Sequence, residues 1–93
     1  MLITVRFLGA LRDHMGAASL PVDVPAGGTY RDVLDAISPI VAARLPDWAW
    51  DPAGRSFSRR MMVSLNGSGS LRNETLGLSD GDEIVVLLPL GGG

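Results

Sequence analysis

The sequence of 93 residues predicts an α+β fold in which a mixed β-sheet holds one main helix against one of its faces. Four short stretches have the apolar pattern of strands, and one stretch between the second and the third has the apolar spacing of a helix. Apolar residues make up 46% of the chain, which is enough for a real core. Without internal repeats or linkers, residues 1–90 are expected to form a single domain and residues 91–93 a flexible Gly-Gly-Gly tail.

The first two strands are expected to form an antiparallel hairpin. Residues 2–8 alternate between apolar and polar side chains, as a strand with one buried face does. Residues 20–24 alternate again, and Pro21 places this strand at an edge of the sheet because proline cannot donate a ladder hydrogen bond. Residues 9–16 are expected to be the connection. The side chains expected to face the core are Ile3, Val5, Phe7, Leu20, Val22 and Val24.

The helix is expected to begin after Thr29, a residue type that caps helix N-termini, and Asp32 complements its first turn. Pro39 is expected to stop or kink it, because a proline inside a helix removes a hydrogen bond. Since Ser38 and Pro39 also have the pattern of a new N-cap followed by proline, a second short helix through about Leu45 is plausible. The apolar stripe consists of Tyr30, Val33, Leu34 and Ile37.

The second half contains the least predictable segment, residues 46–60, which follow no clear period. Its Trp48 and Trp50 are expected to cover the core rather than to bind a partner. Residues 61–66 alternate and predict a third strand with Val63 and Leu65 facing the core. Residues 68–77 are expected to be a loop, with at most one short strand.

The last strand follows a tight turn at Asp80 and Gly81, where glycine accepts a positive φ. Residues 84–88 are apolar and largely β-branched, which is typical of a central strand. Pairing is expected to end at Pro89. If the first and last strands are central neighbours they run parallel, which is the β-grasp arrangement.

The composition excludes several classes of function. A net charge of −2 gives no electrostatic basis for binding nucleic acid, and the absence of cysteine excludes thiol chemistry within the chain. No apolar run is long enough to span a membrane and no leader opens the sequence, so we expect a cytoplasmic protein that does not bind membranes.

Isolated polar residues give weaker signals. The single His14 has no evident partner, so a metal role is not expected for it. Asp80, Asp82 and Glu83 are not expected to form a metal site, because adjacent positions on an incoming strand diverge and turn formation explains the two Asp residues. A basic cluster is expected to be a solvated face, although a groove for an acidic partner is possible. Its members are Arg55, Arg59 and Arg60.

Four segments resemble the ubiquitin-like sulfur-carrier proteins, the MoaD/ThiS-like family that includes the small subunit of molybdopterin synthase and the thiamine-pathway carrier. The resemblance covers the whole chain, although the long segment 46–60 is also similar to the carrier of a cysteine-synthesis route. The segments, in the order of the chain, are residues 7–16, the Val-Ser-Leu-Asn-Gly of residues 63–67, the Leu-Ser-Asp-Gly-Asp-Glu-Ile of residues 78–84, and the Leu-Pro-Leu-Gly-Gly-Gly of residues 88–93.

The resemblance implies that an ATP-dependent, ubiquitin-activating-type (E1-like) adenylyltransferase adenylates the Gly93 carboxylate, which is then converted to a thiocarboxylate. Leu90, Gly91 and Gly92 would thread the active site of the partner, since glycine has no Cβ to obstruct a narrow channel. The carrier would bind no cofactor itself, because ATP is used by the activating partner. An acceptor enzyme such as the molybdopterin synthase large subunit would then receive the sulfur.

A docking patch is expected on the outer face of the sheet. If Val63 and Val86 point toward the helix, Met62, Val85 and Leu87 point away from it. A loop or residues 46–60 could equally cover this patch.

Three functions remain open from the sequence. A sulfur carrier for molybdopterin is favoured, with thiamine, cysteine or tRNA thiolation as other destinations. A ubiquitin-like modifier would be conjugated to lysines of other proteins through Gly93, and a β-grasp interaction module would have an inert tail. The carrier itself is expected to be a protein substrate or a small subunit rather than an enzyme alone.

Overall fold

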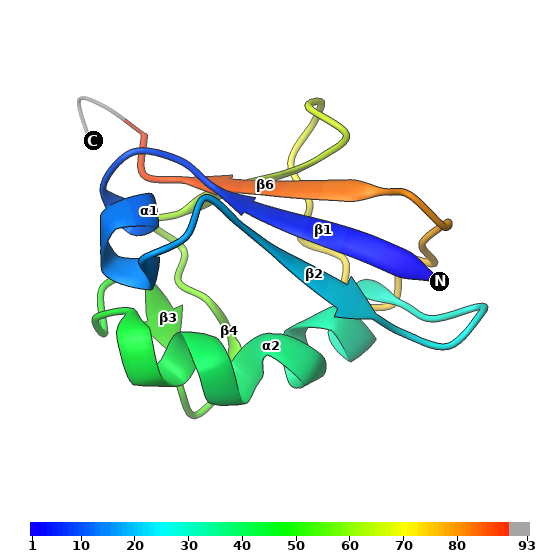
Figure 1. The fold of residues 1–93 in the computed structure, drawn as a ribbon, viewed down its shortest axis with the longest axis horizontal. Helices are drawn as coiled ribbons and strands as arrows, with labels where there is room; N and C mark the ends of the chain where they lie inside the picture. The colour runs from blue at the N-terminus through cyan, green and yellow to red at the C-terminus, as the bar shows by residue number, and fades with distance from the viewer. Residues whose placement is uncertain (90–93) are drawn as a thin grey trace.

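The computed structural model describes residues 1–89, so the predictions for Leu90, Gly91, Gly92 and Gly93 lie outside the described residues. A four-stranded sheet covers one long helix, and a small hairpin lies on the helix side of the sheet (Figure 1). No helix within residues 1–89 is both long and apolar enough to cross a membrane. The elements are β1 (Leu2–Phe7), α1 (Ala10–Met15), β2 (Ser19–Asp23), α2 (Tyr30–Arg44), β3 (Trp50–Asp51), β4 (Ser56–Phe57), β5 (Met62–Leu65) and β6 (Glu83–Leu87).

The main sheet has the order β2-β1-β6-β5, with β1 and β6 parallel at its centre and both outer strands antiparallel to their neighbours. Val5 lies opposite Ile84 in the central pair, and Val63 lies opposite Val86 in the next pair. Pro21 lies in the edge strand β2, where a missing N–H costs no ladder hydrogen bond. The predicted β-grasp arrangement is confirmed.

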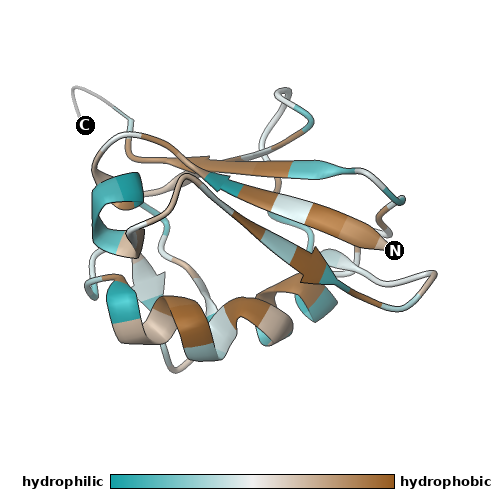
Figure 2. Ribbon diagram, viewed as in Figure 1, coloured by the Kyte–Doolittle hydropathy of each residue, from teal (hydrophilic) through white to brown (hydrophobic). Residues whose placement is uncertain are grey.

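The core lies between the inner face of the sheet and α2, and Figure 2 shows apolar residues along β1, β2, β6 and α2. The predicted inward side chains of the strands are buried, apart from Leu20 and Leu65, which are half-buried. Alternation predicts this well because successive side chains of a strand point to opposite faces. Side chains without any exposed surface are Ile3, Val5, Phe7, Leu11, Val33, Val41, Ala49, Ile84 and Val86.

Helix α2 begins with the predicted cap, in which the Thr29 side chain accepts a hydrogen bond from the Asp32 N–H while the Asp32 carboxylate accepts one from the Thr29 N–H. Of the two outcomes expected at Pro39, a stop or a kink, the stop is wrong, because α2 continues to Arg44 as one helix with this proline inside it. Pro39 is exposed, while Val41 beyond it is fully buried on the same stripe. Packing on both sides of the proline therefore outweighs the loss of one helical hydrogen bond.

Residues 9–16 are more than a connection, because they form the short helix α1. Gly9 and Gly16 flank it with φ of 60° and 70°, a conformation that glycine adopts without strain. Leu11 and Met15, four residues apart, are both buried against the core.

Residues 46–60 contain the hairpin of β3 and β4, in which Trp50 pairs with Phe57. The two rings pack edge to face with their centroids 5.1 Å apart, and Trp50 is only 1% exposed. Trp48 is half-buried against the core and packs edge to face on His14. The tryptophans therefore cover the core, as predicted.

Candidate functional site

Strand β6 carries the chain to the point where the C-terminal tail begins. At its end Leu87 pairs with Met62 of β5, and on the other side the Leu8 N–H donates a hydrogen bond to the Val86 carbonyl at 3.0 Å. The strand ends at Leu87, two residues before Pro89, which cannot donate a ladder hydrogen bond. Because neighbouring strands hold β6 on both sides, the origin of the tail is fixed at the middle of the sheet rather than at its edge.

The predicted docking patch lies on the face of the sheet opposite α2. We call Met62, Val85 and Leu87 the outer patch. Met62 is 46% exposed, and Val85 and Leu87 are half-buried. Met62 and Leu87 lie directly opposite each other across β5 and β6, so their side chains form one apolar surface. The positions of these residues agree with the prediction, whereas docking itself stays a prediction.

The outer patch continues into a hollow of about 360 Å³ at the end of β6. Leu8 is 40% exposed and follows the outward positions of β1, so its parity in the sequence could have placed it on this face. The hollow is almost entirely apolar, and it lies beside the last described residues of the chain. We call it the exit hollow; it is lined by Leu8, Gly9, Ala10, Leu87 and Leu88.

Residues 46–60 do not cover the outer patch. Their hairpin packs against α2 on the other side of the sheet (Figure 1). The outer patch is instead bordered by a polar pair, since Arg6 and Glu83 form an ion pair of 3.2 Å on the same face toward the start of β6. The outward face of β6 is therefore polar near the start of the strand and apolar near its end at Leu87.

The acidic turn before β6 is structural. The Leu2 N–H donates to the Asp80 carboxylate at 2.7 Å, and the Ser79 N–H donates to Asp82 at 2.8 Å. The Asn66 side chain also donates to Asp82, at 3.0 Å, and accepts from the Glu83 N–H. These carboxylates are therefore occupied by turn formation, as predicted, and no group of three potential metal ligands occurs within residues 1–89.

The comparison with known families decides the relationship. A family model described as the ThiS family matches residues 5–93. The chain belongs to the ThiS family. The relationship predicted from the sequence, with the MoaD/ThiS-like ubiquitin-like sulfur carriers, is therefore confirmed.

Several solved structures have a similar fold. SAMP1 from Haloferax volcanii is 24% identical with a TM-score of 0.75, and the match covers 100% of both chains. One chain in the complex of subunits 1 and 2 of the molybdopterin-converting factor of Helicobacter pylori is 22% identical, with a TM-score of 0.58. The match covers 100% of both chains. A chain of the BexX/CysO complex of Amycolatopsis orientalis is 25% identical, with a TM-score of 0.57 over 98% of this chain and 99% of that chain.

Proposed function

We propose that this member of the ThiS family is a sulfur-carrier protein whose Gly93 carboxylate is adenylated and then converted to a thiocarboxylate. The observation that carries the proposal is the family match, which extends through residue 93 and so includes the C-terminal Gly-Gly-Gly. The fold supports it, because β6 delivers the tail from the centre of the sheet beside an exposed apolar surface.

The chemistry requires activation because a carboxylate has no good leaving group. An oxygen of the Gly93 carboxylate would attack the α-phosphorus of ATP, and pyrophosphate would leave. Hydrosulfide or a persulfide sulfur would then attack the carbonyl carbon of the acyl-adenylate and release AMP. Reductive cleavage of the acyl disulfide would be needed in the persulfide case, whereas hydrosulfide gives the thiocarboxylate directly after loss of its proton.

Recognition by the partner enzymes would use two features of the carrier, its C-terminal glycines and the apolar surface at the end of β6. The glycines have no Cβ, so they fit a narrow channel near a nucleotide. The partner enzyme would contact the body of the carrier through the outer patch and the exit hollow, so β6 would set the position of the tail relative to the bound surface. A related carrier fold does occur in a two-protein complex, that of BexX and CysO.

The destination of the sulfur is proposed to be molybdopterin, with the large subunit of a molybdopterin synthase as the acceptor. The support is the resemblance of residues 63–67, 78–84 and 88–93 to the small subunit of that enzyme. Thiamine, cysteine and tRNA thiolation are the competing destinations, and each predicts a different acceptor enzyme bound to the thiocarboxylate form.

The test is intact-mass spectrometry of the full chain after incubation with its activating enzyme, ATP and hydrosulfide, compared with the chain that lacks Gly93. We expect a mass increase equal to the replacement of one oxygen by one sulfur, absent from the truncated chain. Addition of the molybdopterin precursor and the large subunit should restore the original mass.

Two results would contradict the proposal. Isopeptide adducts of Gly93 with lysines of other proteins, without any sulfur exchange, would identify a protein modifier. Self-conjugation through side chains cannot mimic this result, because all eight cationic residues of the chain are arginines. A chain that neither exchanges sulfur nor forms adducts with an active partner would instead be an interaction module.

A further inference from the structure

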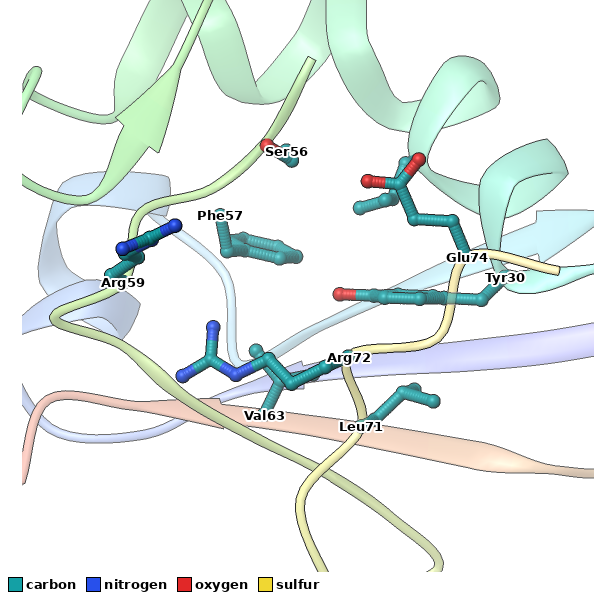
Figure 3. A pocket seen from close by; sticks show the side chains of 9 residues that line it. Tyr30, Ser56, Phe57, Arg59, Val63, Leu71, Arg72 and Glu74 are labelled. Atoms are coloured by element: carbon teal, nitrogen blue, oxygen red, sulfur yellow. The ribbon is translucent and has the colours of Figure 1, made fainter. Parts of the chain in front are cut away.

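A second hollow, of about 300 Å³, lies on the side of the sheet opposite the outer patch. It is formed where α2, the end of β4, β5 and residues 71–74 meet (Figure 3). Its exposed lining is mainly polar, in contrast to the exit hollow. The polar side chains that line it are Tyr30, Ser56, Arg59, Arg72 and Glu74.

Two guanidinium groups face this hollow without a compensating carboxylate. Figure 3 shows Arg59 on the segment that follows β4 and Arg72 on the segment of residues 71–74, with their guanidinium groups at the same end of the hollow. Arg72 donates one hydrogen bond to the Met61 carbonyl at 2.9 Å, but neither arginine forms an ion pair with any acidic side chain of residues 1–89. Two like charges held near each other on one cavity raise the electrostatic energy until an anion lies between them.

The remaining charge of the hollow is already neutralised. Glu74 forms an ion pair of 3.1 Å with Arg31, which also pairs with Asp35. Because Asp35 pairs in turn with Arg55 at 3.5 Å, two guanidinium groups balance these two carboxylates, and Glu74 does not offset the two arginines of the hollow. The ring of Tyr30 is buried, and its hydroxyl points into the hollow (Figure 3). Burial raises the pKa of Tyr30 above its ordinary value, so the hydroxyl keeps its proton at neutral pH and can donate it to a ligand.

We propose that the hollow between Arg59 and Arg72 binds a doubly charged phosphoryl group, either inorganic phosphate or the phosphate of a small phosphorylated molecule. Two guanidinium charges match a dianion, whereas a carboxylate would leave one of them uncompensated. The planar guanidinium forms strong, charge-assisted hydrogen bonds with phosphate oxygens, and the Tyr30 hydroxyl adds a neutral donor. The hollow has about ten times the volume of one liquid water, so a substituent on the phosphate also fits.

This site is independent of the carrier function. It uses none of the tail residues and none of the outer patch, and β5 separates the two surfaces because Val63 lines the hollow while Met62 points to the opposite face. Failure of one proposal therefore leaves the other untouched.

The test is an NMR titration of the full chain with sodium phosphate at mildly alkaline pH, with ionic strength held constant by sodium chloride. We expect saturable shifts of the resonances around the hollow. Arg59→Ala, at an exposed position, should weaken phosphate binding by about tenfold or more, because a hydrogen bond to a charged group is lost. Arg60→Ala is the matched control, since Arg60 is the exposed neighbour that does not line the hollow, and it should change the affinity by less than about twofold.

Further measurements test the role of Tyr30 and the identity of the ligand. Tyr30→Phe keeps the ring and should weaken binding by about tenfold, as expected for the loss of one hydrogen bond to a charged acceptor. Glycerol phosphate that binds tighter than inorganic phosphate would assign the site to a phosphorylated small molecule, and the reverse order would assign it to free phosphate. The proposal is wrong if the shifts do not saturate, if acetate binds as tightly as phosphate, or if Arg60→Ala weakens binding as much as Arg59→Ala.

Discussion

Replacing Met62 and Leu8 together by serine should weaken the binding of the activating enzyme about tenfold to eightyfold. Complete burial of an apolar side chain of this size contributes about 1.5–3 kcal/mol, and only the surface that is still exposed can be buried on docking. Met62 is 46% exposed and Leu8 40%, which corresponds to about 0.7–1.4 and about 0.6–1.2 kcal/mol respectively. The two contributions are expected to add because β6 lies between Leu8 and Met62, which places them two strand spacings, about 10 Å, apart.

The matched control for this prediction is Leu2→Ser. Leu2 is 51% exposed on the same face of the sheet, but it pairs with Asp23 at the opposite end, far from the exit of the tail. The assay measures pyrophosphate release by the activating enzyme as a function of carrier concentration, so that weaker docking raises KM. Thermal unfolding should show that the exposed substitutions change the free energy of unfolding by less than about 0.5 kcal/mol.

The reasoning is refuted if the double variant keeps its KM within about twofold of the parent chain while the fold is intact. A KM that rises only for Leu2→Ser would show that the activating enzyme docks at the other end of the sheet. A KM that rises equally for both variants would show that general surface hydrophobicity, rather than the outer patch and the exit hollow, governs recognition.

Two further predictions concern stability. Arg31→Ala removes ion pairs with Asp35 and Glu74 and two hydrogen bonds to the carbonyls of residues 54 and 55, so the free energy of unfolding measured in urea should fall by about 1–2 kcal/mol. Arg6→Ala removes one exposed ion pair and should lower it by less than about 0.5 kcal/mol; equal losses would contradict a stabilising network around Arg31. Tyr30 is the only tyrosine, and burial raises its pKa above that of the unfolded chain. The contribution of Tyr30 to the free energy of unfolding should therefore be constant below about pH 10, where the unfolded chain ionises, and should fall above it; an unchanged decrease with pH in Tyr30→Phe would assign that decrease to another group.

The sheet and its two faces could be predicted because the signals are local and repeat every second residue. Once Val63 and Val86 are placed in the core, the opposite orientation of Met62, Val85 and Leu87 follows from strand geometry alone. The cap at Thr29 was equally accessible, because the hydroxyl and the carboxylate of Asp32 stand at the spacing of a capping box.

The errors have a common physical origin, since each concerns a segment whose structure depends on tertiary packing. Helix α1 has only two buried side chains, Leu11 and Met15, too few to establish a period. Pro39 obeys a local rule that the packing of Val41 overrides. The β3–β4 hairpin has two-residue strands, which are held by the packing of Trp50 and by Arg31 rather than by any sequence pattern.

Residues of the candidate site were missed for a different reason. Leu8 stands one position beyond its strand, so its outward parity was known but its proximity to Leu87 depends on the parallel pairing of β1 with β6. The sequence groups Arg59 with Arg55 and Arg60 as a basic cluster, but only the folded chain brings it to one hollow with Arg72, thirteen positions away. Local patterns carry no information about such distant pairs.

The position of β6 connects the stability of the fold with the proposed function. Ile84 and Val86 are fully buried on the inner face of this strand, while Val85 and Leu87 of the same strand form the outer patch. Because β6 runs parallel to β1, the chain between them must make a crossover connection. The last strand is then inserted between β1 and β5, and both neighbours hold it by hydrogen bonds. The free energy that stabilises the core therefore also fixes the point at which Pro89 leads into the tail, and a partner that binds the outer patch receives the tail from a rigid origin.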